Sequence, residues 1–205
     1  MTKLFAVTVL LSLSLFGFVC TKQDEPSVFK INTSNKGKLK EYQRLFSKYQ
    51  MDLKISEIDL DEVDADPITV IAHKASQLEE GILVEDTSLE VDGADIGVNI
   101  RWLLDSLDQF ENKKAIWTTL LGYRKGNKIY IFKGEVVGTI VYPQMDGGFG
   151  FDPYFLPEGS TKTLAAEKPD HHNARALAVE NLVNKNCFQI EEAIFDWNGP
   201  WQKHD

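Results

Sequence analysis

A polar turn near the start of the chain has the residue types that bind a phosphate group. It follows a short apolar run at residues 28–31 and precedes a segment whose apolar residues have helical spacing. The first N–H groups of a helix lack internal partners and lie at its positive end, so such a turn is a natural anion site. Lys38 would add a positive charge and Asn35 an amide donor. The candidate residues are Thr33, Ser34, Asn35 and Lys38, and the alternative is a turn that only caps the helix.

Two acidic segments could hold a divalent cation. Glu62 lies in the acidic stretch 59–66, and Glu85 and Asp86 directly follow the apolar run 82–84, which we expect to be a strand. Mg²⁺ prefers oxygen ligands and typically takes one or two carboxylates together with substrate phosphates and water. Open α/β sheets bind ligands beyond the carboxyl ends of their strands, where Asp86 would lie. Glu62, Glu85 and Asp86 are therefore candidate Mg²⁺ ligands, although charge alone favours a solvated acidic loop for residues 59–66.

A glycine-rich segment at residues 147–153 carries two aromatic residues and an acid. Glycines beside an aromatic residue let its ring project from a loop and stack on a base. Phe149 and Phe151 are the candidates for such stacking, and the alternative is that both lie in the core. Asp152 could accept hydrogen bonds from a ligand or cap the turn before Pro153.

The elements that position these residues follow from hydrophobic spacing. We expect strands at residues 28–31, 53–58, 82–84, 129–132, 136–141 and 154–156. We expect helices at 38–49, from Pro67 to Leu78, at 100–110, at 115–121 and at 174–183. The alternation of strands and helices in the first half predicts an α/β fold with parallel pairing in part of the sheet.

The first residues have the features of an export signal. Lys3 precedes an uncharged apolar run at 4–19, which Cys20 and a polar stretch follow. We therefore expect a signal peptide or a membrane or lipid anchor at 1–24, with membrane attachment through 1–20, and a separate domain at 25–205. Export or anchoring is the expected location, with lipidation of Cys20 as one form of it. A buried helix in a cytoplasmic protein is the alternative.

Composition excludes several other classes of protein. The 31 acidic and 22 basic side chains give a net charge of -9, which disfavours binding to a nucleic-acid backbone. Beyond the predicted leader, Cys187 is the one cysteine, so neither an internal disulfide nor a cysteine zinc site is expected. His171 and His172 are adjacent, which is not the spacing that places two imidazoles on one helix face.

Taken in order, five segments resemble motifs of the inosine triphosphate pyrophosphatase family. The family motifs are Thr-Gly-Asn-x-x-Lys, Asp-Leu-x-Glu, Glu-Asp-Thr/Ser, Lys-Trp-Phe-Leu and Phe-Gly-Trp/Tyr-Asp-Pro. Their counterparts lie at 33–38, 59–62, 85–87, 101–104 and 149–153. The resemblance spans residues 29–183 and implies a two-lobed α/β domain around a long mixed sheet with flanking helices, a cleft between the lobes, and a homodimer.

The resemblance also implies an activity and the roles of the residues. The activity is Mg²⁺-dependent hydrolysis of nucleoside triphosphates, of the ITP or XTP type, to the monophosphate and pyrophosphate. Asn35 and Lys38 would hold the triphosphate, and Glu62 and Asp86 would place Mg²⁺. Asp86 or Glu85 would orient or deprotonate the attacking water. The residues implied for base recognition are Phe149, Asp152, Lys168 and His172.

The chain departs from the family at the segment that recognises the base. The family pattern Ser-His-Arg is replaced here, with His172 at the histidine position and Asn173 at the arginine position. Asparagine cannot reproduce the donor fork of a guanidinium. Arg175 is two positions further on, and on a helix we expect it to point elsewhere. The alternatives are a pyrophosphatase with altered base preference and a nucleotide-binding protein without turnover.

Overall fold

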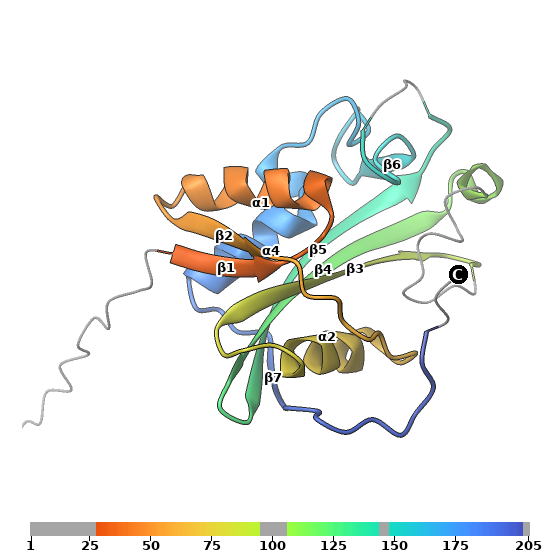
Figure 1. Ribbon diagram of the computed structural model, residues 1–205. Helices are drawn as coiled ribbons and strands as arrows, with labels where there is room; N and C mark the ends of the chain where they lie inside the picture. The colour runs from red at the N-terminus through yellow and green to blue at the C-terminus, as the bar shows by residue number, and fades with distance from the viewer. Residues whose placement is uncertain (1–27, 95–105, 144–147, 203–205) are drawn as a thin grey trace, which may run out of the picture.

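A mixed seven-stranded sheet organises the computed structural model, which describes residues 28–94, 106–143 and 148–202 (Figure 1). The strands are β1 (Val28–Asn32), β2 (Asp52–Ser56), β3 (Ile82–Val91), β4 (Lys114–Lys125), β5 (Lys128–Ile140), β6 (Phe155–Pro157) and β7 (Gln189–Glu192). Their order is β2-β1-β3-β4-β5-β6, and β7 pairs with the first part of β5. The pairs β1–β2 and β1–β3 are parallel and the others are antiparallel. The predicted α/β class with partly parallel pairing is confirmed.

Helices cover both faces of this sheet. They are α1 (Lys36–Ser47), α2 (Pro67–Ser76) and α4 (Ala174–Val183), with 3₁₀ turns at Leu107–Phe110 and Asp170–His172. Helices α1 and α4 lie on one face and α2 lies on the other (Figure 1). Leu83 packs with α1 and α4, whereas its neighbour Val84 packs with α2. Successive residues of β3 therefore serve opposite faces of the sheet, as the pleat requires.

Helix caps explain why the predicted helices begin where they do. Asp66 caps α2, with Pro67 in its first turn, and Asn173 caps α4. Both caps accept hydrogen bonds from the N–H groups that a helix start leaves without partners. The helix predicted at 174–183 is confirmed at both ends, whereas α1 begins two residues before and ends two residues before its predicted bounds.

Two predictions in the middle of the chain were wrong. Residues 115–121, predicted as a helix, belong to β4, which pairs with β3 and β5. Burial alternates along this strand up to Thr119, but residues 119–122 are all buried, so the period-2 pattern is lost there. The predicted pair of strands around 133–135 is one strand, β5, because Gly134 pairs with Thr119 inside the sheet. A Cβ at Gly134 would lie 1.9 Å from the carbonyl oxygen of Ala174. This glycine therefore permits α4 to approach β5 closely and does not form a turn.

Some predicted segments fall outside the described residues. These are the leader at 1–24 and the first part of the predicted helix, at 100–105. Where the second part of that helix was predicted, the structure has the 3₁₀ turn Leu107–Phe110. Within the described ranges, no helix is both long and apolar enough to cross a membrane.

Candidate active site

The polar turn connects β1 to α1, and its side chains organise the start of the helix. Asn35 is the N-cap of α1, and its side-chain oxygen accepts a hydrogen bond of 3.1 Å from the backbone N–H of Lys38. Thr33 accepts from the backbone N–H of Asn35 at 3.2 Å. The turn therefore caps the helix, which was the alternative to phosphate binding. The side-chain oxygen of Asn35 forms the cap, and its amide nitrogen can still donate to a phosphate oxygen. The next N–H groups, of Lys36 and Gly37, begin the helix at its positive end.

Glu85 lies at the centre of a buried cluster of charges on the α1 and α4 face. Its carboxylate is 3.1 Å from Lys38 Nζ and 3.5 Å from an Nη of Arg175, and it accepts a hydrogen bond from the Thr87 hydroxyl. Burial opposes ionisation of Glu85, but Lys38 and Arg175 outweigh it and lower its pKa to about 2. A carboxylate with such a pKa is a weak base, which favours Glu85 as the group that orients Lys38.

Asp86 and Glu62 share an ammonium group on the α2 face. Lys74 Nζ lies 2.9 Å from a carboxylate oxygen of Glu62 and 3.3 Å from one of Asp86. Burial raises the pKa of Asp86, an effect that Lys74 opposes and Glu85 reinforces. Burial would lower the pKa of Lys74, but Asp86 and Glu62 outweigh it and raise it. The two carboxylates predicted to hold a metal are thus brought together around a positive charge.

The end of β1 brings both clusters to one edge of the sheet. Glu85 and Asp86 were predicted to lie at the end of a strand. This prediction was wrong, because β3 continues to Val91 through its pairing with β4. Strand β1 pairs with β3 up to Leu83, and beyond it β3 pairs with β4 alone within the described ranges. The carboxylates therefore lie just past the end of a parallel strand, where ligands of α/β sheets bind, although the strand that carries them runs on.

The glycine-rich segment projects one phenylalanine and buries the other. Phe151 is buried and packs edge-on against Trp117, with ring centroids 5.5 Å apart. Phe149 is 43% exposed, and a Cβ on Gly37 would lie 3.4 Å from its ring, so this ring stands beside the start of α1. Phe149 is thus the ring that is free to stack on a base next to the phosphate-binding turn.

Asp152 performs the capping role that the sequence left as one of two alternatives. It is buried, and its Oδ2 accepts from the backbone N–H of Phe149 at 3.0 Å. The same oxygen lies 2.6 Å from Lys168 Nζ. Lys168 Nζ is also 5.4 Å from the ring centroid of Trp117. Asp152 therefore fixes the loop that carries Phe149 and places Lys168 next to it.

The segment that replaces the family arginine has an unexpected geometry. Asn173 is fully buried, caps α4 and donates to Glu41 at 2.6 Å, so its side chain is committed within the protein. The expectation that Arg175 points elsewhere was wrong. Because it lies in the first turn of α4, its guanidinium reaches Glu41 and Thr87 at 3.3 Å each and lies 6.0 Å from the ring of Phe149. His172, whose ring is 4.2 Å from that of His171, lies in the preceding 3₁₀ turn and is partly buried.

Three residues of this site were not predicted from the sequence. Lys74 follows Val70 by four residues on the buried side of α2, and a charge on an apolar helix face is the signal that it has a charged partner. Glu41 lies on the predicted helix α1 but has no sequence feature that distinguishes it. Trp117 was missed because its strand was predicted to be a helix, and it packs within 5.5 Å of the Arg175 guanidinium.

The residues present fit a bound divalent cation. Three cations, Lys38, Lys74 and Arg175, face four carboxylates, those of Glu41, Glu62, Glu85 and Asp86. This cluster has no excess positive charge with which to bind a polyanionic triphosphate, and Lys74 already takes the position of a cation between two carboxylates. Within the described residues, no three His, Cys, Asp or Glu side chains converge as a complete metal site. Such a pair of carboxylates is the protein share of a Mg²⁺ site that substrate phosphates and water complete.

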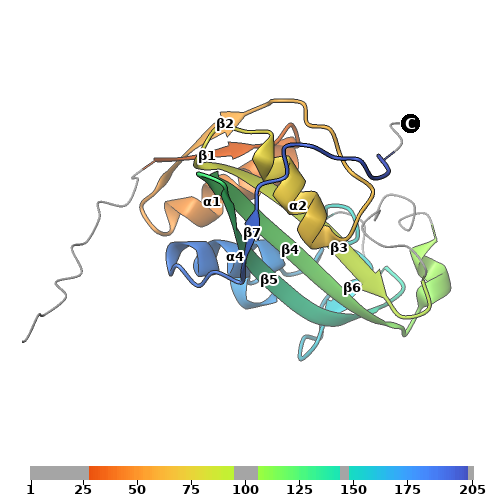
Figure 2. The same cartoon turned by 90° about the horizontal axis from the view of Figure 1, so that it is seen from below.

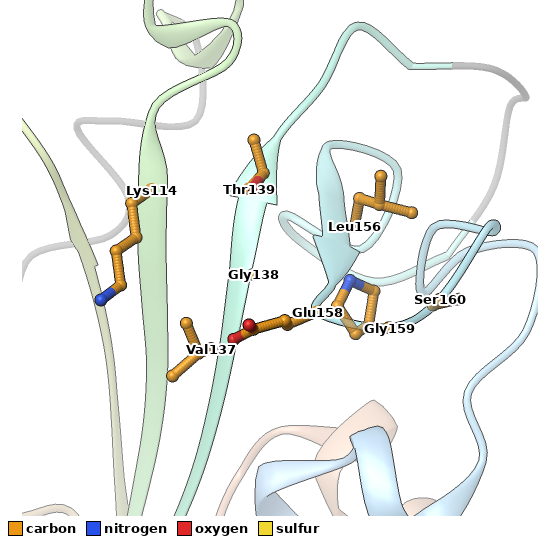
Figure 3. Close-up of a pocket in the computed structure, with 9 residues that line it drawn as sticks. Lys114, Val137, Gly138, Thr139, Leu156, Glu158, Gly159 and Ser160 are labelled. Carbon is orange, nitrogen blue, oxygen red and sulfur yellow. The ribbon is translucent and has the colours of Figure 1, made fainter.

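A separate surface hollow of about 530 Å³ lies near the end of β5 (Figure 3). It is lined by Lys114, Val137, Gly138, Thr139, Leu156, Pro157, Glu158, Gly159 and Ser160. It shares no residue with the clusters described above, and a single lysine and a single glutamate are its charged groups.

Comparison with known proteins shows the family and the fold of this chain. The model of the Ham1 family matches residues 29–185. An inosine triphosphate pyrophosphatase from Yarrowia lipolytica is 31% identical over 179 residues, which cover 78% of this chain and 95% of that protein. A dITP/XTP pyrophosphatase from Pyrobaculum aerophilum is 27% identical over 184 residues, which cover 78% of this chain and 98% of that protein. The crystal structure of a nucleoside-triphosphatase, or dITP/XTP pyrophosphatase, from Mycobacterium abscessus shares the fold, with a TM-score of 0.50 and 21% identity over 75% of this chain and 98% of that one. This chain therefore belongs to the Ham1 family.

Proposed function

We propose that this chain hydrolyses nucleoside triphosphates to the nucleoside monophosphate and pyrophosphate with Mg²⁺ as cofactor. The observation that carries the proposal is the meeting of Lys38 with Glu85, and of Lys74 with Glu62 and Asp86, at one edge of the sheet. Relatives named as inosine triphosphate and dITP/XTP pyrophosphatases support it. Positive groups beside orienting carboxylates are what phosphoryl transfer requires, since positioning and electrostatics supply most of its catalysis.

In this proposal the residues of the site divide the work between binding and attack. The turn at Asn35 and the ammonium of Lys38 bind the triphosphate, and Glu85 orients Lys38 through their ion pair. Asp86 orients the water that attacks the α-phosphorus and accepts its proton as the α–β P–O bond breaks. Bound Mg²⁺ between Glu62, Asp86 and the phosphates would supply charge neutralisation for the departing pyrophosphate.

We propose ITP- or XTP-type purines as the substrates. Phe149 is exposed beside the phosphate-binding turn, and Lys168, held by Asp152, is a donor for the 6-oxo group of the base. His172 remains a candidate for the same edge. Because Asn173 is committed to capping α4, an altered base preference is the second candidate.

Pyrophosphate release from a panel of triphosphates separates these proposals. We expect release with Mg²⁺ and none without it, and we expect Asp86→Asn to abolish it while the protein remains folded. Binding of a triphosphate without release would favour a binding protein that has lost turnover. Equal kcat/KM for ITP and ATP would contradict selectivity for the 6-oxo group.

The location and assembly of the protein are also proposals. We propose that residues 1–24 direct export or anchoring, with attachment through 1–20, and that the domain at 25–205 forms a homodimer. Mass measurement and N-terminal sequencing of the mature protein test the first, because cleavage before Cys20 with added lipid mass differs from an intact Met1. Light scattering of the purified domain tests the second, and a monomer at all concentrations would contradict it.

A further inference from the structure

The C-terminal segment 193–202 returns to the loop that carries Glu62. It leaves β7, passes along α2 and ends beside the connection between β2 and α2 (Figure 2). The family match ends at residue 185, so this segment lies outside the part of the chain that defines the family.

Three consecutive residues of the loop pair with this segment, and the first of them is Glu62. The backbone N–H of Gln202 donates to the carbonyl oxygen of Glu62 at 2.9 Å, and its side-chain amide donates to that of Val63 at 3.1 Å. The backbone N–H of Asp64 donates to the carbonyl oxygen of Pro200 at 3.0 Å. Val63 and Trp201 form an antiparallel bridge, and Val63 is fully buried. The segment thereby fixes the backbone of the loop from Glu62 to Asp64.

The segment is itself held firmly against α2. The backbone N–H of Ile194 donates to the Ser76 hydroxyl at 2.8 Å, and the rings of Trp197 and Trp201 lie 6.2 and 5.4 Å from that of His73. The Trp197 indole donates to the carbonyl oxygen of Pro200, the same atom that Asp64 uses. These contacts connect the loop to the helix that also carries Lys74.

We propose that segment 197–202 positions Glu62 for the cation, so that its residues set the affinity of the site for Mg²⁺ without touching the ion. The inference rests on the proposed function of Glu62. The loop at residues 57–65 has no regular strand or helix. Asn32 holds it at Ile58 and Gln77 holds it at Asp61, and the C-terminal segment holds it from Glu62 to Asp64. Groups that orient a metal ligand typically change metal affinity by about 10- to 100-fold. Here the orienting groups are backbone and side-chain atoms of segment 197–202, which is far from Glu62 in the sequence.

One truncation and three point variants test the proposal. Truncation after Phe195 removes segment 197–202 and leaves β7 in place, and Trp201→Ala removes one of the two rings that lie beside His73. Trp201→Phe retains a ring and should restore most of the wild-type behaviour. Asn198→Ala changes an exposed residue of the same segment that makes none of the contacts described above, and it serves as the matched control.

Three readouts separate positioning from a merely structural role. We expect the truncation and Trp201→Ala to weaken Mg²⁺ binding in calorimetry by about tenfold. The Mg²⁺ concentration for half-maximal activity should rise in parallel, with kcat at saturating Mg²⁺ close to wild type. Amide hydrogen exchange at Asp64, whose N–H donates to the carbonyl oxygen of Pro200, should become faster, while exchange in β3 stays unchanged. If the truncated chain does not fold, the Trp201 pair provides the same comparison.

The outcomes distinguish this inference from the proposed function. Unchanged Mg²⁺ affinity and unchanged exchange at the Asp64 amide in the truncated or Trp201→Ala protein would overturn the positioning role while leaving the hydrolysis proposal intact. A wild-type chain that binds Mg²⁺ but releases no pyrophosphate would overturn the function alone. A wild-type chain that binds no Mg²⁺ even with a non-hydrolysable nucleoside triphosphate present would overturn both.

Discussion

At the scale of single residues, Lys74 is the group on which the metal proposal depends most. Its ammonium group contacts both Glu62 and Asp86. Its ammonium compensates two carboxylates that would otherwise repel one another in a partly buried position. A divalent cation placed between the same oxygens would reduce the need for this lysine.

Replacing Lys74 by methionine tests that reasoning. We expect Lys74→Met to lower the free energy of unfolding by about 1–3 kcal/mol without Mg²⁺, because buried acceptors lose a charged donor. Added Mg²⁺ should recover part of this loss, and kcat/KM should fall by about 10²–10³ through loss of electrostatic stabilisation. Urea unfolding with and without Mg²⁺ measures the first two effects.

An exposed ion pair provides the control for this substitution. Lys162 pairs with Glu167 at the surface, where both side chains are more than half exposed. Lys162→Met should change stability by less than about 1 kcal/mol with or without Mg²⁺. If Mg²⁺ stabilised both variants equally, its effect would not lie at Glu62 and Asp86.

The candidate site could be predicted only in part at this scale. Lys38, Glu62 and Asp86 stand beside apolar runs, and the structure brings each to the same sheet edge. The position of Arg175 could not be predicted, because it depends on how closely α4 approaches the sheet, which two small residues, Gly134 and Ala174, decide.

At the scale of elements, helix caps set the boundaries that the sequence predicted best. Asp66 accepts from the N–H groups of Ile68 and Thr69 and from the Thr69 hydroxyl. The Thr69 hydroxyl is the largest influence that lowers the pKa of Asp66 below its ordinary value, and the backbone donors add to it. A carboxylate with a lowered pKa in the folded state contributes stability that is complete above its unfolded-state pKa.

This cap gives a pH dependence with a definite sign. We expect Asp66→Ala to cost about 1 kcal/mol of unfolding free energy near neutral pH. The difference between the two proteins should shrink as the pH falls below about 4, because the cap protonates and loses its advantage. Urea unfolding at neutral and acid pH measures it, and Asp196→Ala, outside any helix, should show no such difference. A cost that stayed constant into acid would contradict the charged cap.

The close approach of α4 to β5 gives a second test at this scale. We expect Gly134→Ala to lower stability by about 1–3 kcal/mol, since overpacking forces the backbone to move. Its Cβ would lie 1.9 Å from the carbonyl oxygen of Ala174 and 2.6 Å from the backbone nitrogen of Ala178.

Gly159→Ala separates this effect from backbone strain. Gly159 has a φ of 79° and open space around it, so its substitution introduces left-handed strain of about 1–2 kcal/mol and no clash. Gly134→Ala should also weaken triphosphate binding, because α4 carries Arg175, which pairs with the Glu85 that orients Lys38, whereas Gly159→Ala should not. Equal triphosphate affinity in both variants would contradict this link between packing and the site.

Strands were harder to predict than helices for a physical reason. The alternation of apolar and polar residues fails in β4, because Ile116 is apolar on the less buried face and residues 119–122 are buried on both faces of the sheet. Glycine in β5 was interpreted as a turn because its sequence does not reveal that a helix lies against it. In both cases the missing information was the tertiary neighbour.

At the scale of the whole molecule, charge restricts what the protein can bind. The chain has a net charge of -9, and the cations of the candidate site are paired with carboxylates. A nucleic-acid backbone requires an extended positive surface, whereas a triphosphate requires one local site with a metal ion.

This contrast predicts selectivity for the mononucleotide. We expect a triphosphate with Mg²⁺ to raise the melting temperature in a concentration-dependent way, because it binds the folded state. Single- or double-stranded DNA should cause no such shift at moderate salt. A shift with DNA that disappears at high salt would contradict the prediction, because it would indicate binding through a basic surface.

The central claim is that water attacks the α-phosphorus of a nucleoside triphosphate. Hydrolysis of ITP in ¹⁸O-labelled water, with the products separated by mass spectrometry, tests it most directly. We predict that the label appears in the phosphate of the monophosphate and that unlabelled pyrophosphate is released in equal amount. Label in pyrophosphate would indicate attack at the β-phosphorus, and release of inorganic phosphate with the diphosphate would indicate cleavage at the γ position. Either result would contradict the claim.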